Sequence, residues 1–117
     1  MVKQPDVTSL LESALRVASL RQTTIASNIA NMGTPNFRRS AVEFEKALDA
    51  AMRNGSVDPS TVAPTLIHPG TTEVDEKGND VNIDLEVGDM VKNDAMYKTY
   101  MRLLAKKYHQ IDMVVQG

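Results

Sequence analysis

The sequence predicts a mainly α-helical protein in which two long terminal helices pack as an antiparallel α-hairpin or coiled coil. Apolar residues recur at steps of three and four near each end of the chain, the spacing of one helix face. Prolines and glycines concentrate between these two stripes, where we expect a short helix and an irregular loop region with short β pieces. The chain has 117 residues and no cysteine, so one small domain without disulfides is expected.

The first helix is predicted over residues 8–32, within an N-terminal segment of residues 1–35. We expect Thr8 or Ser9 to cap its start, and Gly33, Thr34 and Pro35 to end it. One polar residue, Gln22, interrupts the stripe. The residues predicted to pack against the other terminal helix are Leu11, Leu15, Ala18, Gln22, Ile25 and Ile29.

The second helix is predicted over residues 84–115, within a C-terminal segment of residues 83–117. Asn82 or Asp84 is expected to cap it. Its stripe also contains one polar interruption, at Asp94. The residues predicted to pack against the first helix are Val87, Met90, Asp94, Tyr97, Met101 and Leu104, and the stripe continues through Tyr108, Ile111 and Val115.

The middle segment, residues 36–82, carries a weaker pattern. Helical spacing over residues 42–52 predicts a short helix, which Asn54 and Gly55 would end. Residues 56–82 are predicted to be loop, with extended pieces near 62–67 and 73–74. Because so long a loop is uncommon in a compact domain, we expect it to be mobile or held by a partner.

An antiparallel arrangement pairs the two stripes with few mismatches. Leu11 would face Leu104, Ile25 would face Met90, and Gln22 would face Asp94. Such a polar layer fixes the register of a coiled coil. The alternative is that each polar residue lies at a solvated edge, with Asp94 paired to Lys98 four residues on.

Two surfaces are predicted to contact other molecules. Residues 22–37 carry no charge, and small hydroxyl and amide side chains follow one helix face, as expected of a face packed against neighbouring chains. A neutral exposed face is the alternative. The end of the second stripe has no internal partner in the predicted register, which marks either a contact with another molecule or a frayed end. The candidate assembly residues are Thr24, Ser27, Asn28, Asn31, Thr34, Pro35, Phe37, Tyr108, Ile111 and Val115.

The composition argues against an enzyme, a cofactor or metal site, a small-molecule substrate and a nucleic-acid partner. The net charge of −2 supplies no basic field for nucleic acid. His68 and His109 are isolated from any set of metal ligands, and no phosphate loop or nucleophile motif is present. The basic pairs at residues 38–39 and 106–107 are expected to be solvated, or else to contact acidic patches on neighbours.

Two segments resemble a known family. Residues 26–37, Ala-Ser-Asn-Ile-Ala-Asn-Met-Gly-Thr-Pro-Asn-Phe, are similar to the signature near the N-terminus of bacterial flagellar rod and hook proteins. Asn36 and Phe37 stand where Gly-Tyr is usual, and Asn tolerates the left-handed backbone that glycine would adopt. Residues 78–86 resemble the entry into the C-terminal helix of rod proteins, with Lys77 in place of the usual Asp.

This resemblance implies a structural subunit of the flagellar basal body, and the short chain points to the proximal rod. It implies coiled-coil packing of the terminal helices into a helical tube that transmits torque, with other copies and other rod subunits as partners. It also implies export through the type III apparatus without a cleaved signal peptide, and assembly in the periplasm on the membrane-embedded base. The alternative is a soluble helical adaptor or export-linked binding protein that forms a discrete complex.

Overall fold

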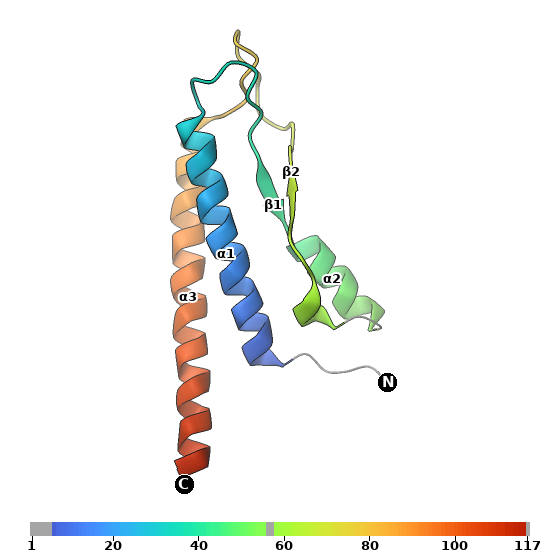
Figure 1. Ribbon diagram of the computed structural model, residues 1–117, viewed down its shortest axis with the longest axis vertical. Helices are drawn as coiled ribbons and strands as arrows, with labels where there is room; N and C mark the ends of the chain where they lie inside the picture. The colour runs from blue at the N-terminus through green and yellow to red at the C-terminus, as the bar shows by residue number, and fades with distance from the viewer. Residues whose placement is uncertain (1–5, 56–57, 117) are drawn as a thin grey trace.

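The computed structural model describes residues 6–55 and 58–116, so residues 1–5 and 117 of the predicted terminal segments lie outside the described part. Three α-helices, one short 3-10 helix and two short strands follow one another along this part of the chain (Figure 1). Their bounds are α1 Val7–Ala30, β1 Ala41–Glu43, α2 Glu45–Asn54, η1 Pro59–Thr61, β2 Thr65–Ile67 and α3 Ile83–Gln116. The predicted mainly helical fold, with long terminal helices and a short middle helix, is confirmed.

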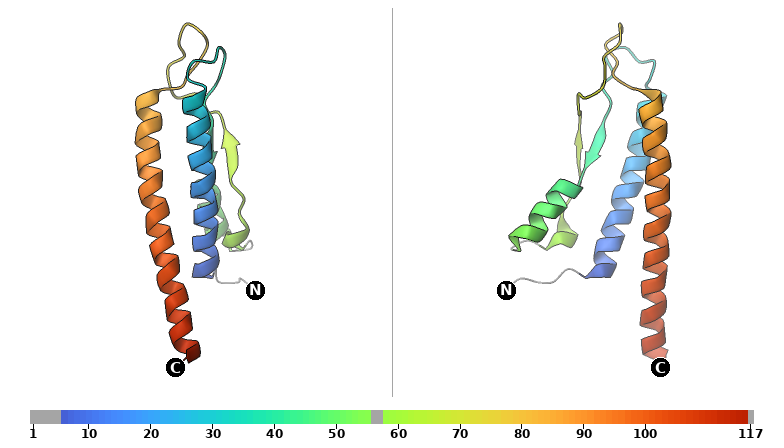
Figure 2. Two further views of the ribbon diagram at one scale, coloured as in Figure 1. Left: turned by 60° about the vertical axis from the view of Figure 1, so that its left-hand side comes forward. Right: turned by 180° about the vertical axis from the view of Figure 1, so that it is seen from behind.

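The two terminal helices lie side by side and run in opposite directions (Figure 1). The two strands and α2 lie on the other side of α1, so that α1 is the middle of three layers (Figure 2). With 34 residues α3 is about 51 Å long, and with 24 residues α1 is about 36 Å long, at 1.5 Å per residue. The C-terminal end of α3 therefore extends beyond the start of α1, as Figure 1 shows.

The helix ends follow local hydrogen bonding. Asp6 caps α1, since its carboxylate accepts from the backbone N–H of Thr8 at 3.2 Å, so the expectation that Thr8 or Ser9 would cap this helix is wrong. The carboxylate can reach the exposed N–H groups of the first turn because the helix begins one residue earlier than predicted. The predicted cap of α3 is confirmed: Asn82 Oδ1 accepts from the N–H of Leu85 at 3.1 Å. Gly55 ends α2 with a φ of 70°, also as expected.

From residue 58 on, the middle of the chain packs on its own helices, where a mobile or partner-held loop was expected. Residues 56 and 57 of that predicted loop lie outside the described part. Strands β1 and β2 pair antiparallel with Val42 opposite Leu66, and Pro59 of η1 is buried. Val42 thus belongs to a strand, and the short helix starts later than the pattern predicted, at Glu45. Residues 73–74, expected to be extended, belong to no strand.

The buried core is small for the length of the chain. Its centre is formed by Val17 of α1, Val42 of β1 and the adjacent Phe44. The radius of gyration is 17.7 Å and the molecule measures 63 × 30 × 15 Å. A compact domain of this length would have a radius of gyration of about 13 Å. Much of the surface that a globular protein would bury therefore remains exposed.

Candidate functional site

A cluster of buried polar side chains ties the strands and the last loop to the tip of the helical hairpin. We name it the tip cluster: Asn28, Arg39, Asn79, Asp80 and Glu86. At its centre Glu86 of α3 is completely buried and accepts from Arg39 Nε at 2.6 Å. Asn28 Nδ2 lies 3.2 Å from both carboxylate oxygens of Glu86. A buried carboxylate is tolerable only when it is paired and hydrogen-bonded in this way.

Asn28 joins three elements through one amide. Its Nδ2 donates to the carbonyl of Ser40 at 2.8 Å while its Oδ1 accepts from the N–H of Ser40 at 2.9 Å, so it pairs with the backbone just before β1. Its exposed fraction is 0%, and that of Thr24 is 8%. These two residues were predicted to lie on the assembly surface, and the structure corrects this. The middle segment and α3 cover this part of α1, which the sequence pattern left uncovered.

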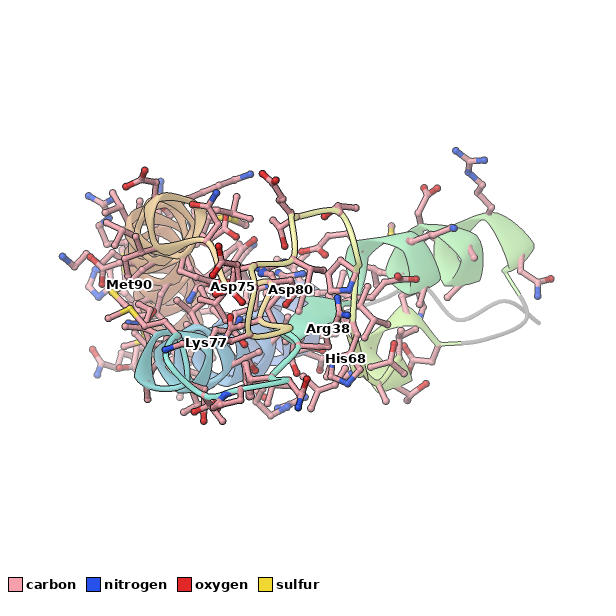
Figure 3. The ribbon with its side chains drawn as sticks, turned by 90° about the horizontal axis from the view of Figure 1, so that it is seen from above. Arg38, His68, Asp75, Lys77, Asp80 and Met90 are labelled. Carbon is pink, nitrogen blue, oxygen red and sulfur yellow. The ribbon has the colours of Figure 1, made fainter. Side chains whose placement is uncertain are left out.

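The loop before α3 is fixed to the end of α1 by side-chain amides. Asn79 Nδ2 donates to the carbonyls of Asn31 and Thr34, both at 2.9 Å. Asp80 accepts from the N–H of Arg39 at 2.6 Å. Figure 3 shows Asp75, Lys77 and Asp80 on the loop that passes over the tip. The carbonyls of Asn31 and Thr34, in the turns just after α1, thus accept from a distant segment as well as from the local backbone.

The two segments that carry the family resemblance meet at this cluster. Residues 26–37 and 78–86 are distant in sequence, yet Asn28 contacts Glu86 and Asn79 contacts Asn31. At the junction Asn36 takes the left-handed backbone expected of it, with a φ of 61°, and its N–H donates to the carbonyl of Lys77 at 2.8 Å. The motif residues therefore hold the two helices and the loop together within one chain.

Sequence reasoning missed Arg39, Asn79, Asp80 and Glu86. Charged and amide side chains near loops are ordinarily exposed to solvent. Arg39 was accordingly expected to be solvated or to contact a neighbouring subunit. Of the two adjacent arginines, Arg38 is exposed and Arg39 is buried. The available signal was the presence of Asn79, Asp80 and Glu86 inside the motif, but residue types alone did not indicate burial.

A polar layer does cross the helical hairpin, but it uses Asn93 rather than Asp94. Asn93 Nδ2 donates to the carbonyl of Ala18 at 2.8 Å and to Gln22 Oε1 at 3.3 Å. Asp94 is exposed and pairs with Lys98 at 3.0 Å. The predicted facing of Gln22 and Asp94 is therefore replaced by a pair one residue earlier on α3.

The residues predicted to pack between the terminal helices differ in burial, because α3 is rotated about its axis relative to the predicted arrangement. Ala18 and Ile25 are buried, and Leu11, Leu15, Ile29, Met90 and Leu104 are partly buried, whereas Gln22, Val87, Asp94, Tyr97 and Met101 are exposed. The residues of α3 that turn inward are Glu86, Asp89, Met90, Asn93, Met96, Tyr100, Leu104 and Lys107. Successive residues lie about 100° apart around a helix. The apolar stripe of α3 is wider than the face that contacts α1, so one side of the stripe stays uncovered.

Large apolar side chains are exposed along much of α3, between charged ones such as Lys92, Asp94, Lys98 and Arg102. Val91 is 66% exposed, and the outer faces also expose Val87, Met101, Leu103, Ile111, Met113, Val114 and Val115. So many exposed apolar residues on one helix mark surface that another molecule can cover. In the isolated chain only one side of α3 is covered, by α1.

The last part of α3, residues 108–116, runs along the first turns of α1 and then past its start, and we name it the overhang. Tyr108 at its beginning donates a hydrogen bond to Glu12 Oε1 at 2.7 Å, and this bond raises the pKa of Tyr108. The prediction that this end of the stripe has no internal partner is therefore wrong for Tyr108. Ile111 is 51% and Val115 80% exposed, and both line a shallow hollow with Asp6 and Thr8 at the start of α1. The remaining predicted assembly residues surround the tip: Ser27, Thr34 and Pro35 are exposed, and Asn31 and Phe37 are partly buried.

A groove of about 420 Å³ opens between α1, β1 and α3. Ile25, Val42 and Met96 are among the apolar residues that line it, and Arg21 and Lys92 are among the charged ones. Arg21 donates through both terminal nitrogens to the carboxylate of Glu45 and holds the pKa of Glu45 below its ordinary value.

No grouping of metal-ligating residues is found within residues 6–55 and 58–116. His68 Nδ1 lies 3.1 Å from the carbonyl of Arg39, so this ring is used in the local structure near the strands (Figure 3). None of the described helices is both long enough and apolar enough to cross a membrane. The fold defines a class of protein, an α-helical hairpin whose C-terminal helix exposes apolar side chains.

Comparison with known proteins gives the family. A sequence profile described as flagella basal body rod protein matches residues 10–38. The flagellar basal body rod protein FlgB of Borreliella burgdorferi is 32% identical, over 87% of this chain and 90% of that protein. FlgB of Bacillus subtilis is 26% identical, over 92% of this chain and 91% of that protein. FlgB of Escherichia coli is also 26% identical, over 91% of this chain and 90% of that protein.

The chain belongs to the flagellar basal body rod protein family. It is a structural component of the basal body rod that assembles with other rod components, and it is not an enzyme.

Proposed function

We propose that this chain is a subunit of the proximal rod whose terminal helices pack with those of neighbouring subunits into a helical tube that transmits torque. The observation that carries the proposal is the excess of accessible surface on the isolated chain, together with the exposed apolar side chains along α3. Its accessible surface is 8002 Å². A folded monomer of its mass, 12.9 kDa, exposes about 6,300 Å². The difference, about 1,700 Å², is roughly twice the area of about 800 Å² that one partner contributes to a standard protein interface.

The position of this surface favours contacts on several sides. The exposed apolar residues of α3 include Val87 near its start, Met101 in its middle and Val115 near its end. Contacts that join unlike faces of identical or related subunits do not close on themselves and produce helical arrays. In such an array torque passes through many packed side chains, because each chain contacts several others.

The same proposal includes the route to the rod. The chain is exported through the flagellar type III apparatus without a cleaved signal peptide, and it assembles in the periplasm on the membrane-embedded base. Membership of the rod family supports this, and so does the small core. A chain held by few buried contacts unfolds readily for passage and gains stability when neighbours cover it.

Cysteine cross-linking in assembled basal bodies tests the packing. The chain has no native cysteine, so each product reports one introduced site. Val91→Cys and Ile111→Cys are placed on exposed faces of α3 and are expected to give products that contain two rod subunits. Val17→Cys, at 2% exposure, is the matched buried control and is expected to give none. Monomer alone at both exposed positions would contradict the proposal.

A further inference from the structure

We infer that the overhang of one copy docks into the groove between α1, β1 and α3 of a second copy. This inference rests on the proposed function, because it names one contact within the rod. Both surfaces exist on each chain, and neither is covered in the isolated molecule.

The groove combines an apolar floor with charged side chains at its rim. Ile25, Val42 and Met96 supply apolar side chains from three elements. The charged groups lining it are Arg21, Arg39 and Lys92 with Glu45 and Asp89, and the buried Glu86 behind Arg39 brings these charges into balance. Arg21 pairs with Glu45, and Arg39 pairs with Glu86 and Asp89. Lys92 forms no ion pair within the described part of the chain, although its charge helps to lower the pKa of Glu45.

The overhang carries the complementary features. Ile111 and Val115 lie four residues apart and form an exposed apolar ridge on one side of the helix. Asp112 is the only residue of the overhang with a formal charge at neutral pH when His109 is neutral. Among the described residues Asp112 has no ion-pair partner either. A ridge on the floor would bring Asp112 to the rim, where Lys92 is available.

A chain cannot fill its own groove with its own overhang. Lys92 and Asp112 are on the same continuous helix, twenty residues apart. At 1.5 Å per residue this separation is about 30 Å. The occupant must therefore be another molecule, and the contact joins unlike faces. Repetition of such a contact generates an open array rather than a closed dimer.

Disulfide formation between two single-cysteine variants of the full chain tests the contact. Met96→Cys places a thiol on the groove floor, and Val115→Cys places one on the overhang. When the two purified variants are mixed and oxidised, we expect a mixed dimer in excess of either homodimer. Val91→Cys mixed with Val115→Cys is the matched control, since Val91 is more exposed but lies outside the groove. Circular dichroism confirms that all variants are folded.

The charge pair is tested in the same assay. Lys92→Glu in the groove variant is expected to lower the yield of mixed dimer about twofold to fivefold at low salt. Asp112→Lys in the overhang variant should restore it, because the two charges are then exchanged. A yield that is unaffected by both reversals would overturn the inference.

Other results separate this contact from assembly in general. If Met96→Cys and Val115→Cys give no mixed dimer above the control, the inference is wrong even where Val91 and Ile111 cross-link in basal bodies, and the proposed function stands. If Met96→Cys links only to a different rod subunit, that subunit and not a second copy fills the groove. If cross-links are absent both here and in basal bodies, the proposed function fails as well.

Discussion

Glu86 is a charged residue that acts as part of the core. It is fully buried where α1, α3 and the segment before β1 meet, and its hydrogen bonds come from Arg39 and Asn28. An aliphatic side chain at this position would pack but could not bond to two donors from different segments. The tip cluster therefore fixes one arrangement of these segments where apolar packing alone would allow several.

Removing the carboxylate of Glu86 is expected to leave Arg39 buried without its closest partner. We predict that Glu86→Ala lowers the free energy of unfolding by about 3–5 kcal/mol, the range for breaking a buried pair. Urea denaturation followed by circular dichroism measures the change. The matched control is Asp94→Ala, which removes an exposed carboxylate paired with Lys98 on the same helix and should cost at most about 0.5 kcal/mol. Equal shifts for the two variants would contradict the role given to Glu86.

The ion pair between Arg21 and Glu45 gives the stability a predictable dependence on pH. Arg21 lowers the pKa of Glu45 below its ordinary value of 4.5, so the folded state holds the ionised carboxylate more firmly than the unfolded state does. The pair's contribution is therefore complete above this ordinary pKa, and is lost as the pH falls through the lower folded pKa.

A double-mutant cycle of Arg21→Gln and Glu45→Gln, repeated over a range of pH, measures that contribution. We expect favourable coupling at neutral pH that disappears in acid. Coupling that persists when the carboxylate is protonated would show that packing, rather than charge, joins the two side chains.

At the scale of elements, periodicity predicted the helices well and their rotation poorly. The steps of three and four located both terminal helices and their antiparallel pairing. The stripe on α3 is wider than the face that α1 covers, and a heptad reading cannot choose which part of a wide stripe turns inward. The pattern therefore selected Asp94 and Met101, whereas Asn93 and Tyr100 face α1.

The middle of the chain was harder to predict because its order comes from long-range contacts. Asn79 and Asp80 hold their loop through bonds to residues at the end of α1 and before β1. Nothing in the local sequence of the loop indicates those partners. The short helix, by contrast, has local spacing and a glycine stop, and it was predicted to within a few residues.

Two glycines in and before α3 should respond in opposite ways to alanine. Gly78 has a φ of 80°, and an added Cβ would lie 2.6 Å from Asn36 Oδ1. Gly88 is helical and has nothing within 4 Å of that position. We predict that Gly78→Ala destabilises the chain by about 1–2 kcal/mol, and that Gly88→Ala stabilises it by about 0.5–1 kcal/mol. Thermal unfolding of both variants measures the difference. Equal effects of the same sign would contradict the left-handed turn at Gly78.

For the whole molecule, folding and assembly draw on different residues. The core around Val17, Val42 and Phe44 and the tip cluster make contacts within one chain. The overhang and the outer faces of α3 contribute little to the isolated fold, because water still surrounds them. An apolar residue in the overhang should therefore matter for the rod and hardly at all for the monomer.

The double variant Ile111→Ser with Val115→Ser tests this separation. Both side chains are more than half exposed, so the free energy of unfolding of the monomer should change by no more than about 0.5 kcal/mol. Incorporation into basal bodies, measured by immunoblotting of purified rods, should fall sharply because each neighbour loses an apolar contact. Val17→Ser is the opposite control: it should unfold the monomer, because it places a hydroxyl in the small core. If the overhang variant instead unfolds the monomer, residues 108–116 serve the fold of the single chain. If it enters rods at the normal level, the apolar side chains of the overhang are not needed for assembly.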